Sequence, residues 1–252
     1  MTTTILITGA SAGIGKATAE LLAKTSGTRL ILTGRRVDKL REVADTLKCE
    51  THLLTFDVRD REAALFALRS LPKEWNAIDV LVNNAGLALG LTPFTESDYD
   101  DWQVMVETNI LGLLTMAREI IPGMKARGRG HVVNLSSIAG SYQYPGGHVY
   151  GATKAFVTQL SLMLRADLLG SPIRVTNIEP GMVETEFSMV RFKGDEERAS
   201  KVYENTTPLT AEDIAETIRW SITQPRHVNI NRIEIMPVTQ APAALAVHRE
   251  KS

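Results

Sequence analysis

The sequence predicts an α/β fold: one doubly wound parallel sheet of about seven strands, with helices on both faces. Short runs of branched apolar residues, typical of strands buried on both sides, alternate along the chain with segments of helical periodicity. The first strand-like run leads directly into a glycine-rich turn and a helix. The chain has 252 residues, which suits one α/β unit, and it shows no internal repeat or low-complexity linker.

Composition and charge exclude several classes of function. The net charge is -1, with 44% apolar and 23% charged residues, so neither nucleic acid nor an anionic membrane is expected as a partner. The histidines show no close ligand spacing, so no metal site is expected. The lone cysteine, Cys49, excludes an internal disulfide and is expected to be a small, partly buried apolar side chain. The chain shows neither a leader sequence nor a long apolar run, which predicts a cytoplasmic protein.

The glycine-rich turn predicts a phosphate site. A β-branched run, Thr4–Thr8, leads into the glycines of residues 9–15, and Lys16–Lys24 has helical spacing. Glycines permit a tight turn and close backbone approach, and a helix N-terminus offers unpaired N–H groups and a positive dipole end. The spacing Gly-x3-Gly-x-Gly differs from the Gly-x-Gly-x2-Gly of long-chain dinucleotide enzymes. The alternative is a tight strand-to-helix turn that binds nothing.

The end of the second strand, Arg29–Thr33, bears on the choice of cofactor. In a dinucleotide-binding sheet an acid at this point binds the free ribose hydroxyl of NAD, whereas a basic residue accommodates the 2′-phosphate of NADP. This chain has Arg35 and Arg36 there, and its next acid is Asp38, which fits the first turn of a helix. Arginine matches phosphate geometry well. We therefore expect NADP; the alternative is a solvated basic helix start.

The third and fourth strands also end in polar residues. His52–Phe56 is followed by Asp57, which suits either contact with an adenine amino group or capping of a helix near Asp60. Ile78–Val82 leads into paired asparagines within residues 83–86. Side chains at the carboxyl ends of parallel strands lie in the ligand crevice of an open sheet, although asparagines also occur in simple turns.

A long helix is expected after a loop at residues 88–100. The helical pattern covers Asp101–Arg127 and contains Asn109, whose poor helix propensity calls for a tertiary explanation. Pro122 is expected to kink or divide the helix near its end. The fifth strand, His131–Leu135, then ends at Ser137.

The next helix, expected to run to about Leu169, begins with a tyrosine and a lysine four residues apart. In a helix Tyr150 and Lys154 project from one face, and a nearby cation favours the phenolate form of a tyrosine. The pair therefore suits a residue that gives and takes a proton. The alternative is a chance pairing on an ordinary helix.

The last third of the chain repeats the strand and helix alternation. A sixth strand is expected at Ile173–Ile178, a polar and partly helical excursion at Gly194–Asn205, a helix at Thr210–Ile222 and a seventh strand at Arg232–Met236. A tail then extends to Ser252. No linker interrupts this pattern, so residues 1–252 are expected to form one dinucleotide-binding and catalytic domain.

Together these motifs resemble the short-chain dehydrogenase/reductase family, whose fold is a Rossmann-type sheet. The matching residues, in family order, are Thr8, Gly9, Gly13 and Gly15, Asn83 to Gly86, Asn109, Ser137, Tyr150 and Lys154, and Pro180, Gly181 and Thr185. The resemblance covers essentially the whole chain. It implies that a loop or lid at residues 182–208 covers the substrate.

The resemblance implies roles for these residues. Tyr150 would be the catalytic acid/base, and Ser137 would orient the substrate oxygen. Lys154 would lower the pKa of the tyrosine and hold the nicotinamide ribose, and Asn109 would link this lysine to a water chain. The implied cofactor site comprises Gly9, Ser11, Gly13, Ile14, Gly15, Arg35, Arg36, Asp57, Val58, Asn84, Tyr150, Lys154, Pro180, Gly181, Val183 and Thr185.

Further stretches are similar to a subgroup of NADP-dependent 3-hydroxy acid dehydrogenases that act on serine and allo-threonine. They include residues 83–90, 150–156, 190–195 and 228–240. This similarity implies interconversion of a 3-hydroxy acid (serine, allo-threonine, 3-hydroxyisobutyrate or 3-hydroxypropionate) with its 3-oxo acid, in a homotetramer. One departure is Ser136, where close relatives carry glycine. The alternatives are a reductase of another carbonyl, such as a 3-oxoacyl thioester, sugar or ketone, and an NADP-sensing regulator.

A 3-hydroxy acid also needs a partner for its carboxylate. Arg191 lies in the segment expected to cover the substrate, and a guanidinium binds a carboxylate with two parallel hydrogen bonds. We therefore hypothesise that Arg191, together with Ser137 and Tyr150, binds the substrate; the alternative is a solvated basic loop. Gln143 and His148 are further candidates for the pocket lining, although His148 is better interpreted as a helix-start residue than as a second base.

Overall fold

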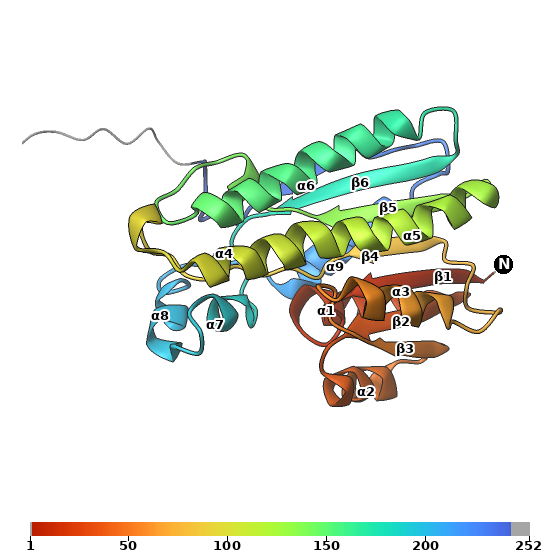
Figure 1. Cartoon of the computed structure of the whole chain (residues 1–252), viewed down its shortest axis with the longest axis horizontal. Coiled ribbons are helices and arrows are strands. Elements are labelled where there is room, and N and C mark those ends of the chain that lie inside the picture. Colours follow the sequence, from red (N-terminus) through yellow and green to blue (C-terminus); the bar gives the residue numbers. More distant parts are fainter. Residues whose placement is uncertain (1, 243–252) are drawn as a thin grey trace, which may run out of the picture.

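A computed structural model of the chain describes residues 2–242 and contains one seven-stranded parallel sheet (Figure 1). The strand order is β3-β2-β1-β4-β5-β6-β7. The strands are β1 Thr3–Thr8, β2 Thr28–Gly34, β3 Thr51–Thr55, β4 Val80–Asn83, β5 Gly130–Leu135, β6 Ile173–Pro180 and β7 Arg232–Ile235. The predicted doubly wound parallel sheet is confirmed, and each expected strand is present within two residues at either end.

Helices cover both faces of the sheet, as predicted. One face carries α1, α2 and α9, and the other carries α3, α5 and α6. The helices are α1 Gly13–Leu22, α2 Val37–Thr46, α3 Arg61–Arg69, α4 Tyr99–Val106, α5 Leu113–Ala126, α6 His148–Asp167, α7 Phe187–Arg191, α8 Glu196–Lys201 and α9 Ala211–Thr223. Among the described residues, none of these helices has the length and apolarity needed to cross a membrane.

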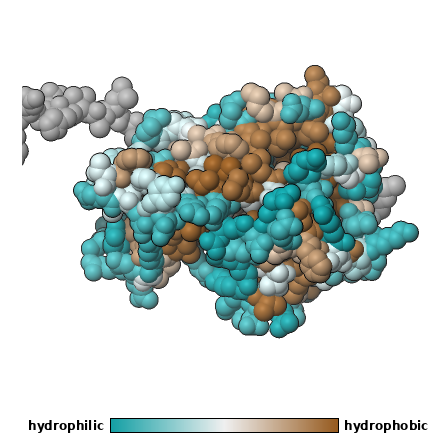
Figure 2. Space-filling view, in the orientation of Figure 1, coloured by the Kyte–Doolittle hydropathy of each residue, from teal (hydrophilic) through white to brown (hydrophobic). Residues whose placement is uncertain are grey.

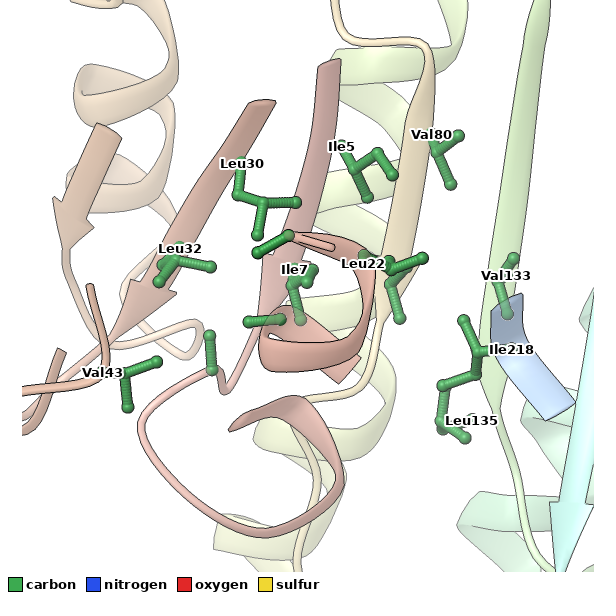
Figure 3. Packing of buried hydrophobic residues seen from close by; sticks show 14 of the residues in the cluster. Ile5, Ile7, Leu22, Leu30, Leu32, Val43, Val80, Val133, Leu135 and Ile218 are labelled. Atoms are coloured by element: carbon green, nitrogen blue, oxygen red, sulfur yellow. The ribbon is translucent and has the colours of Figure 1, made fainter. Parts of the chain in front are cut away.

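The core consists of two apolar layers separated by the sheet. Alternate side chains of a strand point to opposite faces, so Ile5 and Ile7 pack beneath α1 and α9 (Figure 3), whereas Leu6 packs toward α3 and α5. All three residues are almost fully buried. Both faces of the central strands are therefore covered, which explains why their sequences are continuously apolar.

The strand order reverses at β1, and this reversal positions the site. From β1 the chain winds outward to β2 and β3, and then returns to place β4 on the other side of β1. The loops after β1 and β4 therefore leave the sheet in opposite directions. Such a switch point opens a crevice at the carboxyl ends of the strands.

The long helix predicted for residues 101–127 differs from the expectation in one respect. It consists of α4, a π-helical turn at Glu107–Gly112, and α5. Pro122 lies inside α5, which continues beyond it to Ala126, so it does not divide the helix. Helix α7 was not predicted from the sequence, and the predicted loop at residues 88–100 contains a short 3-10 turn at Phe94–Glu96.

Candidate active site

A cavity of about 620 Å³ opens at the carboxyl ends of β1, β4, β5 and β6. It extends from the glycine-rich turn to the beginning of α6. The sequence-predicted residues that line it are Gly9, Ser11, Gly13, Ile14, Arg35, Arg36, Asp57, Val58, Asn84, Ser137, Tyr150, Lys154, Pro180, Gly181, Val183, Thr185 and Arg191. The two remaining candidates, Gly15 and Asn109, are buried directly behind lining residues.

The glycine-rich turn requires glycine at specific positions. Gly9 and Gly13 have φ of 67° and 51°, in the left-handed region that favours glycine. A Cβ on Gly15 would lie 2.3 Å from the carbonyl oxygen of Gly9. The N-cap of α1, Ala12, provides no side-chain hydrogen bond to the first turn. The N–H groups at this helix end are therefore free of a side-chain cap and lie beside the cavity.

Asn84 joins the ends of β1 and β4, whereas its neighbour Asn83 does not face the cavity. The Asn84 Nδ2 donates to the carbonyls of Thr8 (2.9 Å) and Gly9 (3.2 Å). Asn83 is buried and donates to Asn134 Oδ1 at 2.9 Å, within the core. Only one of the paired asparagines therefore shapes the crevice.

Two arginines and two carboxylates meet at the far end of the cavity. Arg35 lies 3.6 Å from Asp57. Arg36 donates to Ser11 Oγ at 3.3 Å and forms an ion pair with Glu186 at 3.2 Å. The two guanidinium groups are more than half exposed, so they remain accessible to a ligand from solvent.

Asp57 does not cap the helix, which was one of its two predicted roles. Asp60 is the N-cap of α3 and accepts from the Ala63 amide at 2.9 Å. The Asp57 carboxylate instead accepts three hydrogen bonds from Arg59, one from its amide and two from its guanidinium. Burial of Asp57 opposes the charged form, but these bonds outweigh it and hold the pKa of the carboxyl below its usual value.

The predicted tyrosine and lysine begin α6, and Ser137 follows β5 beside them. Tyr150 and Lys154 are 9% and 6% exposed. Lys154 Nζ donates to the Leu135 carbonyl at 2.9 Å and lies 5.8 Å from the centre of the Tyr150 ring. Ser137 accepts from the Ala139 amide at 3.1 Å and interacts with the Tyr150 hydroxyl. The end of β5 therefore meets the first turns of α6 at one point.

Burial dominates the acid–base properties of this pair. It raises the pKa of Tyr150 to about 12, against smaller opposing effects of the Ser137 hydrogen bond and the Arg191 charge. Burial also lowers the pKa of Lys154 to about 8. Lys154 is not among the groups that shift the pKa of Tyr150 in this arrangement, and its Nζ donates to the Leu135 carbonyl.

Asn109 lies in the π-helical turn between α4 and α5. Its Oδ1 accepts from the Leu87 amide at 2.9 Å, while its Nδ2 donates to the Leu87 carbonyl at 2.8 Å and to Thr153 Oγ1 at 3.0 Å. A Cβ placed on Gly86 would lie 3.2 Å from both Asn109 Oδ1 and Lys154 Nζ. Asn109 therefore ties the loop after β4 to α6 and lies close to the lysine.

Residues 182–203 form the outer wall of the cavity. Arg191 donates to Tyr144 Oη at 2.6 Å and to the Gly90 carbonyl at 3.3 Å, and its guanidinium lies 5.4 Å from the centre of the Tyr150 ring. The alternative of a solvated loop arginine does not apply, because Arg191 is half-buried. Lys193, by contrast, is exposed and pairs with Asp101.

His148 is the first residue of α6 and does not line the cavity, whereas Gln143 does. His148 Nδ1 accepts from the Val149 amide at 2.9 Å, and Nε2 lies 3.2 Å from the Thr92 carbonyl. These contacts agree with its interpretation as a helix-start residue.

Several residues that line or support the cavity were not foreseen from the sequence. Tyr144 lies in an irregular loop with no periodic signal, and Glu186 meets Arg36 across 150 positions of sequence. Arg59 engages Asp57 from only two residues away. This spacing of two residues is a local sequence signal that could have identified Arg59 as the partner of the Asp57 carboxylate.

Comparisons with known proteins identify one family and several similar dehydrogenases. The family described as short chain dehydrogenase matches residues 3–196. A probable NADP-dependent dehydrogenase of Haemophilus influenzae is 55% identical over 99% of both chains. An NADP-dependent 3-hydroxy acid dehydrogenase of Salmonella typhi is 54% identical over 97% of this chain and 99% of its own. A closed form of serine dehydrogenase complexed with NADP+ superposes with a TM-score of 0.96 at 52% identity, covering 98% and 100% of the two chains.

Proposed function

The chain belongs to the short-chain dehydrogenase family, and on that premise we propose that it is an NADP-dependent oxidoreductase interconverting 3-hydroxy acids and 3-oxo acids. The observation that carries this proposal is the meeting of three groups in one cavity: a buried phenol, a serine hydroxyl beside it, and a half-buried guanidinium over the phenol ring. The names of two relatives, a 3-hydroxy acid dehydrogenase and a serine dehydrogenase, support the substrate class.

The residues present fit a dinucleotide phosphate. A Cβ on Gly15 would collide with the turn, and the uncapped start of α1 offers amides to a pyrophosphate. Arg35 and Arg36 lie where the second strand ends and suit a 2′-phosphate, with Ser11 beside Arg36. Asn84 and Thr185 line the cavity between these arginines and Tyr150.

The proposed mechanism assigns proton transfer and alignment to the protein. Bound NADP would supply the hydride acceptor or donor. In oxidation, phenolate Tyr150 accepts the proton of the substrate hydroxyl, which Ser137 orients by a hydrogen bond. In reduction, the Tyr150 hydroxyl donates its proton to the developing alkoxide. Lys154 holds its ammonium close to the Tyr150 ring. Asn109 fixes the loop after β4 through the backbone of Leu87.

Arg191 is the proposed partner of the substrate carboxylate. Within the described residues, it forms no ion pair with a protein carboxylate. Of the acids that line the cavity, Asp57 pairs with Arg35 and Arg59, and Glu186 pairs with Arg36. A guanidinium near the reacting hydroxyl therefore favours an anionic substrate over a neutral ketone or sugar.

Two further proposals concern assembly and movement. We propose that residues 182–208 act as a lid, because they supply the outer wall of the cavity and reach across to Gly90. We also propose a homotetramer, supported by exposed apolar side chains on the helices described below. The cytoplasmic location expected from the sequence stays a prediction.

Replacement of Tyr150 by phenylalanine tests the proposed chemistry. Tyr150→Phe removes the proton acceptor and keeps the ring, so turnover of 3-hydroxy acids should fall by about a thousandfold or more, within the range of acid–base catalysis with its added hydrogen bond. NADP+ binding, measured by calorimetry, should stay within about twofold. Tyr99→Phe is a matched control, because Tyr99 is 70% exposed on α4. Retained turnover in Tyr150→Phe would exclude the mechanism.

A further inference from the structure

Tyr144 is fixed from two sides at the substrate end of the cavity. A Cβ on Gly147 would lie 2.4 Å from Tyr144 Cζ, so the ring rests directly on the backbone of this glycine. Its hydroxyl accepts from Arg191 Nη2 at 2.6 Å. A tyrosine in a loop is thus held in one orientation by the backbone on one side and by an arginine on the other.

Arg191 has hydrogen-bonding capacity beyond its protein contacts. Its Nε donates to the Gly90 carbonyl and its Nη2 to Tyr144, which leaves the other guanidinium N–H groups without a protein acceptor among the described residues. The guanidinium also lies between aromatic rings, 5.6 Å from the centre of Tyr144 and 5.9 Å from that of Phe187. The apolar rings limit its access to water, so an anionic ligand would be bound strongly there.

The Tyr144 hydroxyl also retains a donor. A phenol oxygen can accept one hydrogen bond and donate its own proton to another group. Tyr144 accepts from Arg191, and no described residue accepts the Tyr144 proton. Because Tyr144 lines the cavity, this proton is available to an acceptor bound inside it.

We propose that Tyr144 is a specificity-determining residue that binds the substrate carboxylate together with Arg191. One carboxylate oxygen would accept from the Arg191 guanidinium and the other from the Tyr144 hydroxyl. This inference rests on the proposed function and adds to it a second carboxylate ligand.

The arrangement also predicts a preference for a short substrate. The Arg191 guanidinium lies 5.4 Å from the centre of the Tyr150 ring, so the carboxylate site and the proton acceptor are adjacent. In a 3-hydroxy acid a single methylene or substituted carbon separates the carboxylate from the hydroxyl-bearing carbon. A longer separation would displace the hydroxyl from Tyr150 and Ser137.

The test compares an acid with its neutral ester. Tyr144→Phe keeps the ring on Gly147 and removes only the hydroxyl. Its kcat/KM for 3-hydroxyisobutyrate should fall by about tenfold or more, as expected for loss of a hydrogen bond to a charged group, mainly through KM. For the methyl ester it should change by less than about twofold. Tyr99→Phe, a matched control, removes a hydroxyl from a side chain that is 70% exposed on α4 and should leave both values unchanged.

A double variant separates direct binding from support of Arg191. If Tyr144 contacts the carboxylate itself, Tyr144→Phe should cause a further loss with the acid when added to Arg191→Gln. No further loss, or equal losses with acid and ester, would overturn the proposal. The proposed function fails differently: a wild-type enzyme that oxidises neither compound, or that favours the ester, would refute the substrate class whatever Tyr144→Phe does.

Discussion

The phenol of Tyr150 is difficult to ionise in the environment that the fold provides. Its burial raises the pKa to about 12, and the groups that oppose this effect are the Ser137 hydroxyl and the Arg191 charge. In the alcohol-oxidising direction of the proposed mechanism, the phenolate is the reactive form. The fraction of Tyr150 in the phenolate form is therefore expected to depend on pH and on the Ser137 and Arg191 side chains.

This dependence predicts different pH behaviour in the two directions. Below a pKa of about 12, each pH unit raises the phenolate fraction about tenfold, so log kcat/KM for oxidation should rise with a slope near one between pH 7 and 9. In the reductive direction Tyr150 is the acid and stays protonated, so kcat/KM should be nearly flat over the same range. Initial rates in both directions test this. A plateau in oxidation below pH 8 would show that another group, such as Lys154, controls the rate.

For single residues, the sequence predicted which side chains share the site, but not the hydrogen bonds between them or their pKa values. The resemblance to the short-chain dehydrogenase/reductase family assigned Tyr150, Lys154 and Ser137 to one site, and all three line the cavity. Their pKa values were not predictable, because they depend on burial by segments far apart in the chain. Tyr144 was missed for the same reason: its contact with Arg191 spans 47 positions, and an irregular loop has no periodicity.

Among the secondary-structure elements, α1 depends most directly on a single glycine. Gly15→Ala would place a Cβ 2.3 Å from the Gly9 carbonyl oxygen and 2.6 Å from Asn84 Nδ2. The turn must shift, which should lower the free energy of unfolding by about 1–3 kcal/mol and weaken NADP+ binding.

A glycine-to-alanine change on another helix is the matched control. At Gly123, inside α5, the new Cβ would meet no backbone atom and only the guanidinium of Arg127, at 3.0 Å, which also donates to the Ile78 carbonyl. Gly123→Ala should therefore lower the free energy of unfolding by less than Gly15→Ala, since alanine favours the helix by about 1 kcal/mol over glycine. Chemical denaturation and calorimetry with NADP+ measure both effects. Equal behaviour of the two variants would refute the argument from close packing.

Elements with a local sequence pattern were predicted, whereas elements that depend on tertiary contacts were not. The strands were predicted because β-branched runs between glycines and polar residues mark them locally. Helix α7, with five residues, lacks a detectable pattern and depends on contacts such as that of Arg191 with Gly90. The π-helical turn at Glu107–Gly112 also escaped prediction, because it accompanies the tertiary hydrogen bonds of Asn109.

At the scale of the whole molecule, an apolar surface extends over α5 and α6. Figure 2 shows hydrophobic residues gathered along these helices, and Phe156, Leu162 and Met163 are 37%, 38% and 54% exposed. An exposed patch of this kind is typical of a surface that another protein covers. It supports the proposed association of identical chains.

A charged substitution tests this association. Met163→Glu would bury a carboxylate if the surface is covered, so light scattering after gel filtration should show a smaller assembly for this variant than for the wild type. Phe66→Glu on α3 is the control, because Phe66 is 75% exposed outside this surface. A tetramer that persists in Met163→Glu, or a wild-type monomer, would contradict the proposal.

The π-helical turn makes it possible to separate activity from folding. A π-turn contains one residue more than an α-turn, so the stretch Glu107–Gly112 between α4 and α5 accommodates an extra residue. Deletion of Ile110 should therefore convert this stretch into one continuous α-helix with its buried face intact. Asn109 would leave the Leu87 backbone, so turnover should be lost while the circular dichroism spectrum is retained.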